Sequence, residues 1–216
     1  MAPVSRAGRR IVVLCEGDTE ELAVRRFLWR QWRDEGLAGV GLRPINLNGK
    51  LEDAANFAAD YLDEQDVLSV FTLIDLAGMN RVRHQPNDAL ELKVGRVRDW
   101  LRARLSHPRQ AVFHPHVSVH EVEAWILAEG TALSKRLRDP SIVRDPAAEA
   151  KDFDNPPSER INRLFRSRVG RRYQKIEDGG SLFSKMSFQP VYETCRYFRE
   201  FYEDLRAVAR GYFPLP

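Results

Sequence analysis

The order of apolar and amphipathic segments in the first 75 residues is the feature that most constrains the fold. Two runs rich in β-branched residues, 11–15 and 67–74, are predicted to be buried strands, and a third strand is expected at 40–47. Amphipathic helices are predicted between these strands, at 19–35 and 51–64. This alternation predicts an α/β fold with an open, mostly parallel sheet and helices on both faces.

The remainder of the chain is predicted to be mainly helical. A long helix is expected at 89–105 and a fourth strand at 111–119, whereas the proline-rich stretch 138–157 predicts a loop or lid. Helical patterns continue from there toward the end of the sequence. We therefore expect an α/β core at 8–130 and a helical C-terminal extension at 131–216 that packs on the core.

Composition and chain length exclude several classes of protein. The 216 residues are 43% hydrophobic and 30% charged, which is too apolar for a disordered chain. The apolar runs are far shorter than the roughly 20 residues that cross a bilayer. Two cysteines, Cys15 and Cys195, are too few for a disulfide scaffold or an all-cysteine zinc site. We expect a soluble, cytoplasmic protein without membrane contact, in which Cys15 is a small buried residue.

Acidic residues follow three of the four expected strands. Those after the first, third and fourth strands are, in that order, Glu16, Asp75, and the pair Glu121 and Glu123. Because the carboxyl ends of parallel strands meet at one edge of a sheet, we expect these carboxylates to lie close together. A set of oxygen ligands without cysteine favours Mg²⁺ or Mn²⁺ over Zn²⁺. Each acid alone also has a structural interpretation, as a helix cap or a turn residue.

Histidines and glycines add less to the prediction. His120 adjoins Glu121, where an imidazole could contact a phosphate or act as an acid–base partner. His114 and His116 point to one face of the fourth strand, and packing is the favoured interpretation because nothing completes a metal site around them. The sequence contains neither of the glycine-rich loops that bind nucleotide phosphates, so no nucleotide site is expected.

A block of positive charge lies between residues 158 and 175. It contains seven basic residues and one acid, Glu159, whereas the net charge of the whole chain is only +3. Charge of one sign predicts contact with a phosphate backbone, which releases counterions on binding. The alternative is a solvated, arginine-rich helix face. The basic residues are Arg160, Arg163, Arg166, Arg168, Arg171, Arg172 and Lys175.

Several linked motifs carry a resemblance to a known family. The strand, the segment Glu16-Gly-Asp-Thr-Glu20 and the helix after it resemble the first motif of the Toprim fold. The later motifs resemble those of an uncharacterised Toprim-like family, whose patterns D-Y-Y-G, H-E-F-E-A and P-S-K-R-I are followed by Y-x-K, G and C-x-x-F. The corresponding segments here are 71–79, 120–124, 156–161, 173–175, Gly179 and 195–198. The resemblance extends over about residues 10–206.

This resemblance implies a fold and a chemistry. It implies a Toprim-like core related to the nuclease part of overcoming-lysogenization-defect proteins, with divalent-metal-dependent phosphodiester chemistry. Members of the family are often encoded beside an ATPase of the ABC/AAA type in bacterial anti-phage defence or DNA-repair gene clusters. The partners implied are therefore DNA or RNA and such an ATPase.

The resemblance also implies roles for individual residues. Glu16 would be a metal ligand or general acid–base, and Asp75, Glu121 and Glu123 would be further ligands. Phosphate or transition-state charge would be held by Ser158, Arg160 and Lys175. Catalytic roles therefore fall on Glu16, Asp75, Glu121 and Lys175. The expected nucleic-acid contacts are Ser158, Arg160, Arg163, Arg171, Arg172 and Lys175.

One departure from the Toprim pattern keeps more than one function open. Toprim enzymes usually carry D-x-D in the second motif, and Ala77 stands in place of the second acid. The favoured hypothesis is a metal-dependent nuclease that uses Glu121 or Glu123 to complete the site. The alternative is a catalytically degenerate subunit that binds nucleic acid or an ATPase. The third hypothesis is an unrelated phosphatase or phosphotransfer enzyme.

Overall fold

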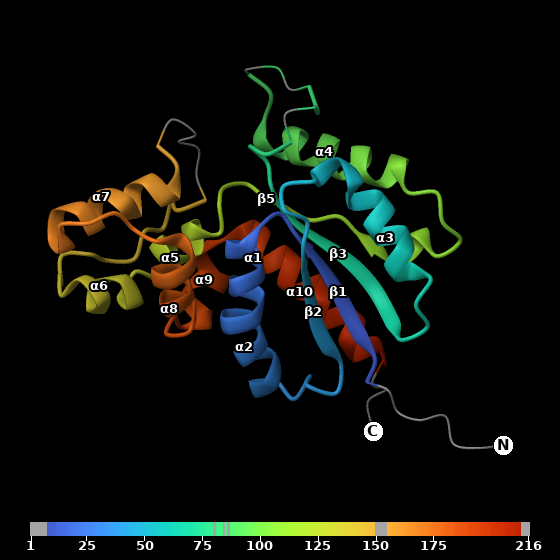
Figure 1. The fold of residues 1–216 in the computed structure, drawn as a ribbon, viewed down its shortest axis with the longest axis horizontal. Helices are drawn as coiled ribbons and strands as arrows, with labels where there is room; N and C mark the ends of the chain where they lie inside the picture. The colour runs from blue at the N-terminus through green and yellow to red at the C-terminus, as the bar shows by residue number, and fades with distance from the viewer. Residues whose placement is uncertain (1–7, 80, 84, 86, 150–154, 213–216) are drawn as a thin grey trace.

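The described residues form a parallel five-stranded sheet flanked by helices (Figure 1), in a computed structural model. The strand order is β2-β1-β3-β4, and β5 pairs with β3 beyond β4, every pair being parallel. The strands are β1 (Arg10–Cys15), β2 (Gly41–Asn46), β3 (Val67–Asp75), β4 (Phe113–His114) and β5 (Val117–Ser118). The structure describes residues 8–79, 81–83, 85, 87–149 and 155–212. The predicted α/β class and mostly parallel sheet are confirmed.

The two central strands are buried on both sides, which explains their continuous apolar sequence. In β1, Ile11, Val13 and Cys15 face one core and the alternate residues Val12 and Leu14 face the other. The helical segment after β1 and the C-terminal helix α10 (Arg196–Tyr212) contribute to the first core. The second core receives α3 (Ala54–Leu62) and α4 (Leu90–Arg104). Cys15 is fully buried, as expected.

Helices predicted in the first half of the chain lie close to their expected positions. The helix expected at 19–35 is a continuous segment made of α1 (Asp18–Ala23), a π-helical turn and α2 (Trp29–Asp34). The π-helical turn spans Val24–Leu28. The helix expected at 51–64 begins with a 3₁₀ turn at Leu51–Asp53 and continues as α3.

The C-terminal helices share the core of the sheet. Leu133, Phe183 and Phe198 belong to the same buried cluster as Ile11 and Val13 of β1. Figure 1 shows most of these helices beside the sheet and α10 behind it. The division at residue 130 stays a prediction, and residues 150–154 and 213–216 lie outside the described part. The helices are α5 (Glu123–Glu129), α6 (Thr131–Leu137), α7 (Pro157–Val169), α8 (Gly180–Phe183), α9 (Phe188–Thr194) and α10.

The fourth strand differs from the prediction. Instead of one strand at 111–119, a 3₁₀ turn at Gln110–Val112 precedes the short strands β4 and β5. Pro115 separates these strands and has no N–H to donate to a ladder. The side-chain oxygen of Thr72 on β3 replaces the missing backbone pairing, because it accepts from His116 N at 2.9 Å and donates to His116 O at 2.7 Å.

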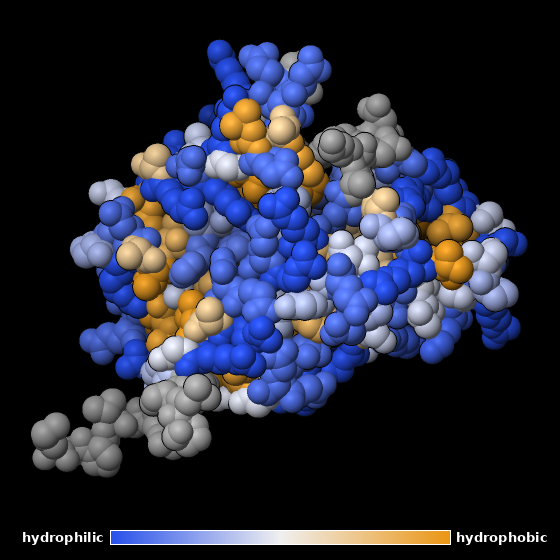
Figure 2. Space-filling view, turned by 180° about the vertical axis from the view of Figure 1, so that it is seen from behind, coloured by the Kyte–Doolittle hydropathy of each residue, from blue (hydrophilic) through white to orange (hydrophobic). Residues whose placement is uncertain are grey.

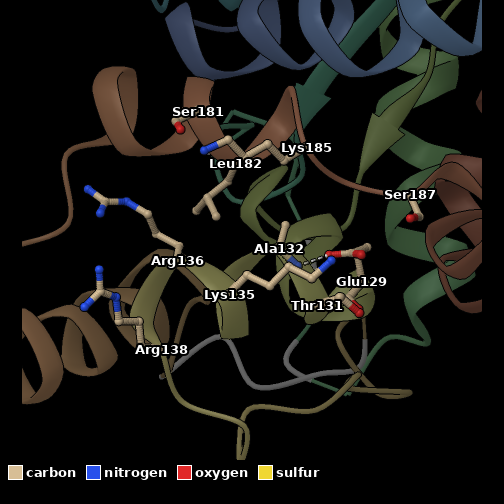
Figure 3. A pocket seen from close by; sticks show the side chains of 10 residues that line it. All are labelled: Glu129, Thr131, Ala132, Lys135, Arg136, Arg138, Ser181, Leu182, Lys185 and Ser187. Atoms are coloured by element: carbon tan, nitrogen blue, oxygen red, sulfur yellow. Dashed lines mark hydrogen bonds between the residues drawn. The ribbon is translucent and has the colours of Figure 1, made fainter.

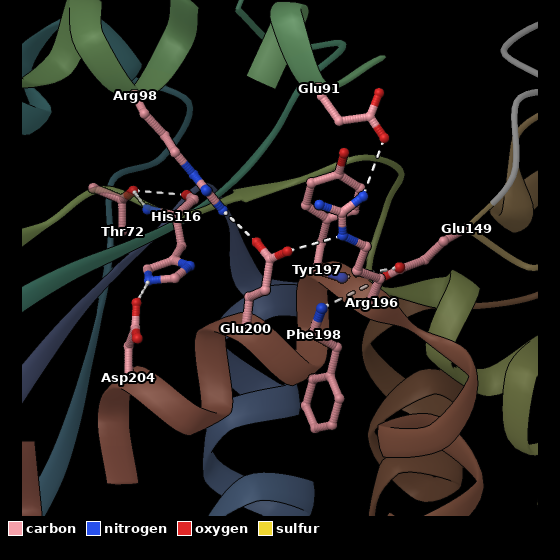
Figure 4. Close-up of polar contacts among 10 residues, drawn as sticks. All are labelled: Thr72, Glu91, Arg98, His116, Glu149, Arg196, Tyr197, Phe198, Glu200 and Asp204. Carbon is pink, nitrogen blue, oxygen red and sulfur yellow. Dashed lines mark hydrogen bonds and ion pairs between the residues drawn. The ribbon is translucent and has the colours of Figure 1, made fainter. Parts of the chain in front are cut away.

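A polar cluster ties α10 to the sheet and to α4 (Figure 4). His116 stacks near Phe71, with ring centroids 5.8 Å apart, and its Nε2 lies 3.0 Å from Asp204 Oδ2 of α10. Arg98 of α4 lies 3.3 Å from Glu200. These contacts give His116 a packing role, which is the interpretation that the sequence favoured.

The face turned away in Figure 1 is mainly hydrophilic, and its apolar residues appear as separate patches (Figure 2). Among the described residues, no helix has both the length and the apolar character needed to cross a bilayer.

Candidate functional site

Glu16 and Asp75 lie side by side at the carboxyl ends of β1 and β3. Oε2 of Glu16 accepts a hydrogen bond from the backbone N–H of Asp75 at 2.8 Å. The Asp75 carboxylate accepts from the N–H of Ala77 at 3.0 Å, which closes a tight turn after the strand. Asp75 therefore has the turn contact that the sequence left open, whereas Glu16 does not cap the following helix and instead binds the backbone of Asp75; both lie at the same edge of the sheet.

Glu121 and Glu123 reach this edge from the junction between β5 and α5. The two oxygens of Glu121 accept from the Ser158 N–H at 2.9 Å and from Lys175 Nζ at 2.7 Å. Glu123 is completely buried, and its carboxylate oxygens accept no well-formed hydrogen bond from the described residues, although the Tyr173 hydroxyl interacts with this carboxyl group. Lys175 Nζ lies 3.7 Å from Glu123 Oε1. The ammonium group of Lys175 thus faces both acids, and Glu123 has fewer hydrogen bonds than a buried carboxylate needs.

A fifth acid, Glu20, belongs to the same cluster, although sequence reasoning assigned it no role. It lies on the first turn of α1, is only 9% exposed, and accepts from the Gly17 N–H at 3.1 Å. Its negative charge contributes to raising the pKa of both Asp75 and Glu123. The available signal was its spacing, because a residue four positions after Glu16 lies on the first helical turn above the strand end.

Burial and mutual repulsion raise the pKa of most of these carboxyl groups. Burial, followed by the charges of Glu16, Glu121 and Glu20, raises the pKa of Asp75 to about 7. Burial, followed by Glu121 and Glu20, raises the pKa of Glu123 to about 8 against the opposing effect of Lys175. The cluster is therefore short of positive charge near neutral pH.

Contacts with Lys175 lower the pKa of one member of the cluster, Glu121. Burial works to raise the pKa of Glu121, but hydrogen bonds from Lys175 and Ser158 outweigh it, so the pKa is lowered. Burial works to lower the pKa of Lys175, but Glu123 and Glu121 outweigh it in turn and the pKa is raised. Glu121 and Lys175 therefore form an ion pair at neutral pH.

The donor chemistry of the cluster fits a hard divalent cation, although the side chains do not form a closed shell. Within the described ranges, no three acid, histidine or cysteine side chains converge in a geometry that would hold a metal ion. The donors are nevertheless all oxygen, and the two oxygens of Glu123 are buried at the edge of the sheet without a well-formed hydrogen bond from the described residues. The residues that could hold the ion are Glu16, Asp75, Glu121 and Glu123.

The predicted nucleic-acid contacts divide into two groups. Ser158 and Lys175 lie at the carboxylate cluster through their contacts with Glu121. Other members contact neighbouring polar groups: Arg160 pairs with Asp145, Arg163 donates to Asn155, and Arg171 pairs with Asp178. Arg172 is exposed, and its side chain has no ion pair within the part of the chain that the structure describes. The basic block is therefore partly engaged in internal pairs.

His120 lies in the buried layer beside the cluster. It is only 4% exposed, and its backbone oxygen accepts a hydrogen bond from the Ser118 hydroxyl. A side chain so buried has little access to a phosphate unless its surroundings move. The acid–base role of His120 stays a prediction.

Comparisons with known proteins give one family and several similar folds. The family described as "Domain of unknown function (DUF4276)" matches residues 15–206. The C-terminal region of the Xanthomonas campestris pv. campestris OLD protein is 17% identical, covers 95% of this chain and 98% of its own, and has a TM-score of 0.48. The C-terminal region of the Burkholderia pseudomallei OLD protein is 13% identical, with coverages of 92% and 98% and a TM-score of 0.44. No curated protein matches the chain.

Proposed function

The chain belongs to the family described as domain of unknown function DUF4276, and we propose that it is a divalent-metal-dependent nuclease that hydrolyses phosphodiester bonds of DNA or RNA. The observation that carries the proposal is the state of Glu123. This carboxyl group is fully buried beside four other acids, lacks a well-formed hydrogen bond from the described residues and has its pKa raised to about 8, so a bound cation would be needed for it to ionise at neutral pH.

In this proposal Glu16, Asp75, Glu121 and Glu123 hold Mg²⁺ or Mn²⁺. The bound ion would polarise the phosphodiester and lower the pKa of a water molecule. Lys175 is placed to neutralise charge on the phosphate once its ammonium group turns from Glu121 toward the substrate. The Ser158 N–H keeps Glu121 oriented while this happens.

Two carboxyl groups have proton affinities suited to acid–base chemistry near neutral pH. The pKa of Asp75 is about 7 and that of Glu123 is about 8, so each exchanges a proton in the range where a general acid or base works best. Asp75 is the more accessible of the two, whereas Glu123 has no exposed surface. A bound divalent cation would keep its carboxylate ligands ionised, so we assign a ligand role to Asp75 and Glu123 and give proton transfer, where Glu16 does not bind the ion, to Glu16.

Contacts with the rest of the nucleic acid are proposed for the basic block. Arg172 is exposed and is the most available for a phosphate, whereas Arg160, Arg163 and Arg171 would have to exchange an internal partner for one. An ATPase partner, with a role in anti-phage defence or DNA repair, is proposed on the resemblance of the motifs alone.

The second candidate function is a catalytically degenerate subunit that binds nucleic acid or an ATPase. Ala77 favours it, because this exposed position after β3 carries a methyl group where Toprim enzymes carry an acid. The absence of a preformed three-ligand group among the described side chains favours it as well.

Calorimetric titration with Mn²⁺ separates the two functions. We expect the wild-type protein to bind Mn²⁺ and the variants Glu16→Ala and Asp75→Ala to lose binding. The control is Asp99→Ala, which removes a carboxylate whose side chain is 79% exposed on α4 and should bind as the wild type does. Cleavage of labelled DNA and RNA in Mn²⁺ should follow the same pattern. Nucleic-acid binding that is unaffected by EDTA, with neither Mn²⁺ binding nor cleavage, would instead establish the degenerate subunit.

A further inference from the structure

A basic pocket opens between α6 and the segment that contains α8, away from the five acids. Its volume is about 520 Å³, within the range of ligand-sized pockets. Figure 3 shows Arg136 and Arg138 pointing the same way from one wall, and Lys185 lying on the wall formed by the α8 segment. The lining also includes the hydroxyl-bearing residues Thr131, Ser181 and Ser187.

The charge of the pocket is strongly positive. Four cations line it, namely Lys135, Arg136, Arg138 and Lys185, against the single carboxylate of Glu129. That carboxylate is already engaged, because Glu129 is 3% exposed and Oε2 accepts from the Ala132 N–H at 2.7 Å. Arg136 already forms an ion pair with Asp178, whose Oδ1 lies 3.1 Å from its Nη2. The other three cations form no ion pair with any residue that the structure describes, so they are available to an anion.

Arg138 is held in the pocket wall at a conformational cost. It ends α6 with φ 52° and ψ 41°, the left-handed conformation that glycine and asparagine adopt most readily at this position. This conformation ends the helix, because the N–H of Asp139 donates to the carbonyl oxygen of Ser134 at 3.0 Å. It also leaves Arg138 in the lining of the pocket, as a third cation without an ion pair among the described residues.

The lining selects the phosphate and sugar of a nucleic acid and not its bases. Only Ala132 and Leu182 are apolar, and the lining contains no aromatic ring on which a base could stack. Lysine, arginine and hydroxyl groups are the usual partners of phosphate oxygens. The pocket therefore suits a phosphodiester backbone without reading its sequence.

One short segment connects the pocket to the acids. Lys175, which contacts Glu121, begins a helical stretch that continues through Asp178 to Ser181 and Leu182 in the pocket wall. Six residues of helix span about 9 Å, so a bound strand reaches from one site to the other within a few nucleotides. We propose that this basic pocket holds backbone phosphates of the polynucleotide whose scissile bond lies at the carboxylate cluster. The inference rests on the proposed nuclease function.

The test measures binding without cleavage. Fluorescence anisotropy of a labelled DNA or RNA oligonucleotide, in EDTA and over a series of salt concentrations, gives both the affinity and the number of phosphate contacts. The variant Lys135→Ala/Lys185→Ala should bind at least tenfold more weakly, and the slope of log K against log salt should fall by about 2. The matched control Arg33→Ala/Lys93→Ala removes the same charge from α2 and α4 and should keep the slope of the wild type.

A second variant guards against a folding defect. Arg138→Gly removes a cation and relieves the left-handed backbone, so it should fold at least as well as the wild type and still lose affinity. If both pocket variants bind like the control, the pocket has no role in binding and the inference is wrong, whereas the nuclease proposal stands. If the wild type binds no polynucleotide at all, the proposed function itself fails.

A competition experiment shows whether the pocket binds the phosphates of a polynucleotide or those of a small ligand. Inorganic phosphate and AMP should displace the oligonucleotide only at concentrations far above those at which a second, unlabelled oligonucleotide does so. Displacement by AMP at micromolar concentration, lost in Arg138→Gly, would identify a pocket for a small phosphorylated ligand and overturn the polynucleotide assignment.

Discussion

Gly78 lies against the carboxylate of Glu16. A β-carbon at Gly78 would come within 2.8 Å of Glu16 Oε1 and 3.0 Å of Oε2, and within 2.9 Å of Leu51. The turn after β3 therefore leaves room for the Glu16 side chain only because residue 78 has no side chain of its own. This contact connects the second motif directly to the acid of the first.

The variant Gly78→Ala should displace Glu16. Because the carboxylate must move by several tenths of an ångström or more, we expect Mn²⁺ affinity in calorimetry to fall at least tenfold while the far-UV circular dichroism spectrum is retained. Gly95→Ala is the control, since nothing lies within 4 Å of a β-carbon there and alanine should stabilise the helix by up to about 1 kcal/mol. Equal Mn²⁺ affinities in the two variants would contradict a role for this contact.

The raised pKa values of Asp75 and Glu123 predict that stability falls as pH rises. Each carboxyl keeps its proton in the folded state up to about pH 7 or 8 but loses it near pH 4 when unfolded, so the folded state binds more protons between these values. The free energy of unfolding in EDTA should therefore decrease from pH 5 to pH 9, by up to roughly 1.4 kcal/mol per pH unit for each group.

Glu123→Gln isolates one of these groups. The amide cannot ionise, so the variant should lose less stability than the wild type between pH 5 and pH 9 in urea unfolding. Mn²⁺ should raise the stability of the wild type at pH 8, by about 2.7 kcal/mol at a hundredfold excess over its Kd, and should have a smaller effect on Glu123→Gln. Identical pH profiles for the two proteins would show that Glu123 does not titrate in this range.

The variant Lys175→Met tests whether the ammonium group of Lys175 occupies the position that a bound metal ion would take. Lys175 Nζ contacts Glu121 at 2.7 Å and lies near Glu123, so an incoming metal ion must compete with it. We expect Lys175→Met to bind Mn²⁺ more tightly than the wild type in calorimetry and to lose cleavage, because the charge that would face the phosphate is gone. Lys93→Met serves as the control on α4. Weaker Mn²⁺ binding by Lys175→Met would mean that the lysine organises the acids instead of competing for them.

The sheet and the meeting of its acids could be predicted from the sequence because both follow from local patterns. Continuous apolar strands separated by amphipathic helices require parallel pairing, and parallel pairing places Glu16 and Asp75 at one edge. The interruption of the fourth strand was missed, although Pro115 marks it, because the compensating Thr72 hydroxyl lies 44 residues away in sequence.

The pairing of charges that lie far apart in the sequence was the larger feature that could not be predicted from the sequence. The block at 158–175 was predicted from its own composition, and its acidic partners come from other segments. Asp145 pairs with Arg160, and Asp139 lies 2.8 Å from Arg168. Glu20 was overlooked because its helical position shows only that it faces the strand end, and its burial depends on the helices that pack later in the chain.

Arg171 and Arg172 are neighbours in sequence for which the structure predicts opposite behaviour. Arg171 donates to both oxygens of Asp178, at 2.6 and 2.7 Å, and Asp178 is only 1% exposed, whereas Arg172 is exposed. Arg171→Ala should lower the free energy of unfolding by about 1–3 kcal/mol, because a buried carboxylate loses its main partner. Arg172→Ala should leave stability unchanged and reduce the salt slope of oligonucleotide binding by about 1.

Urea unfolding and anisotropy on the same two proteins measure both effects. Loss of affinity in Arg171→Ala without loss of stability would assign the nucleic-acid contact to Arg171 instead.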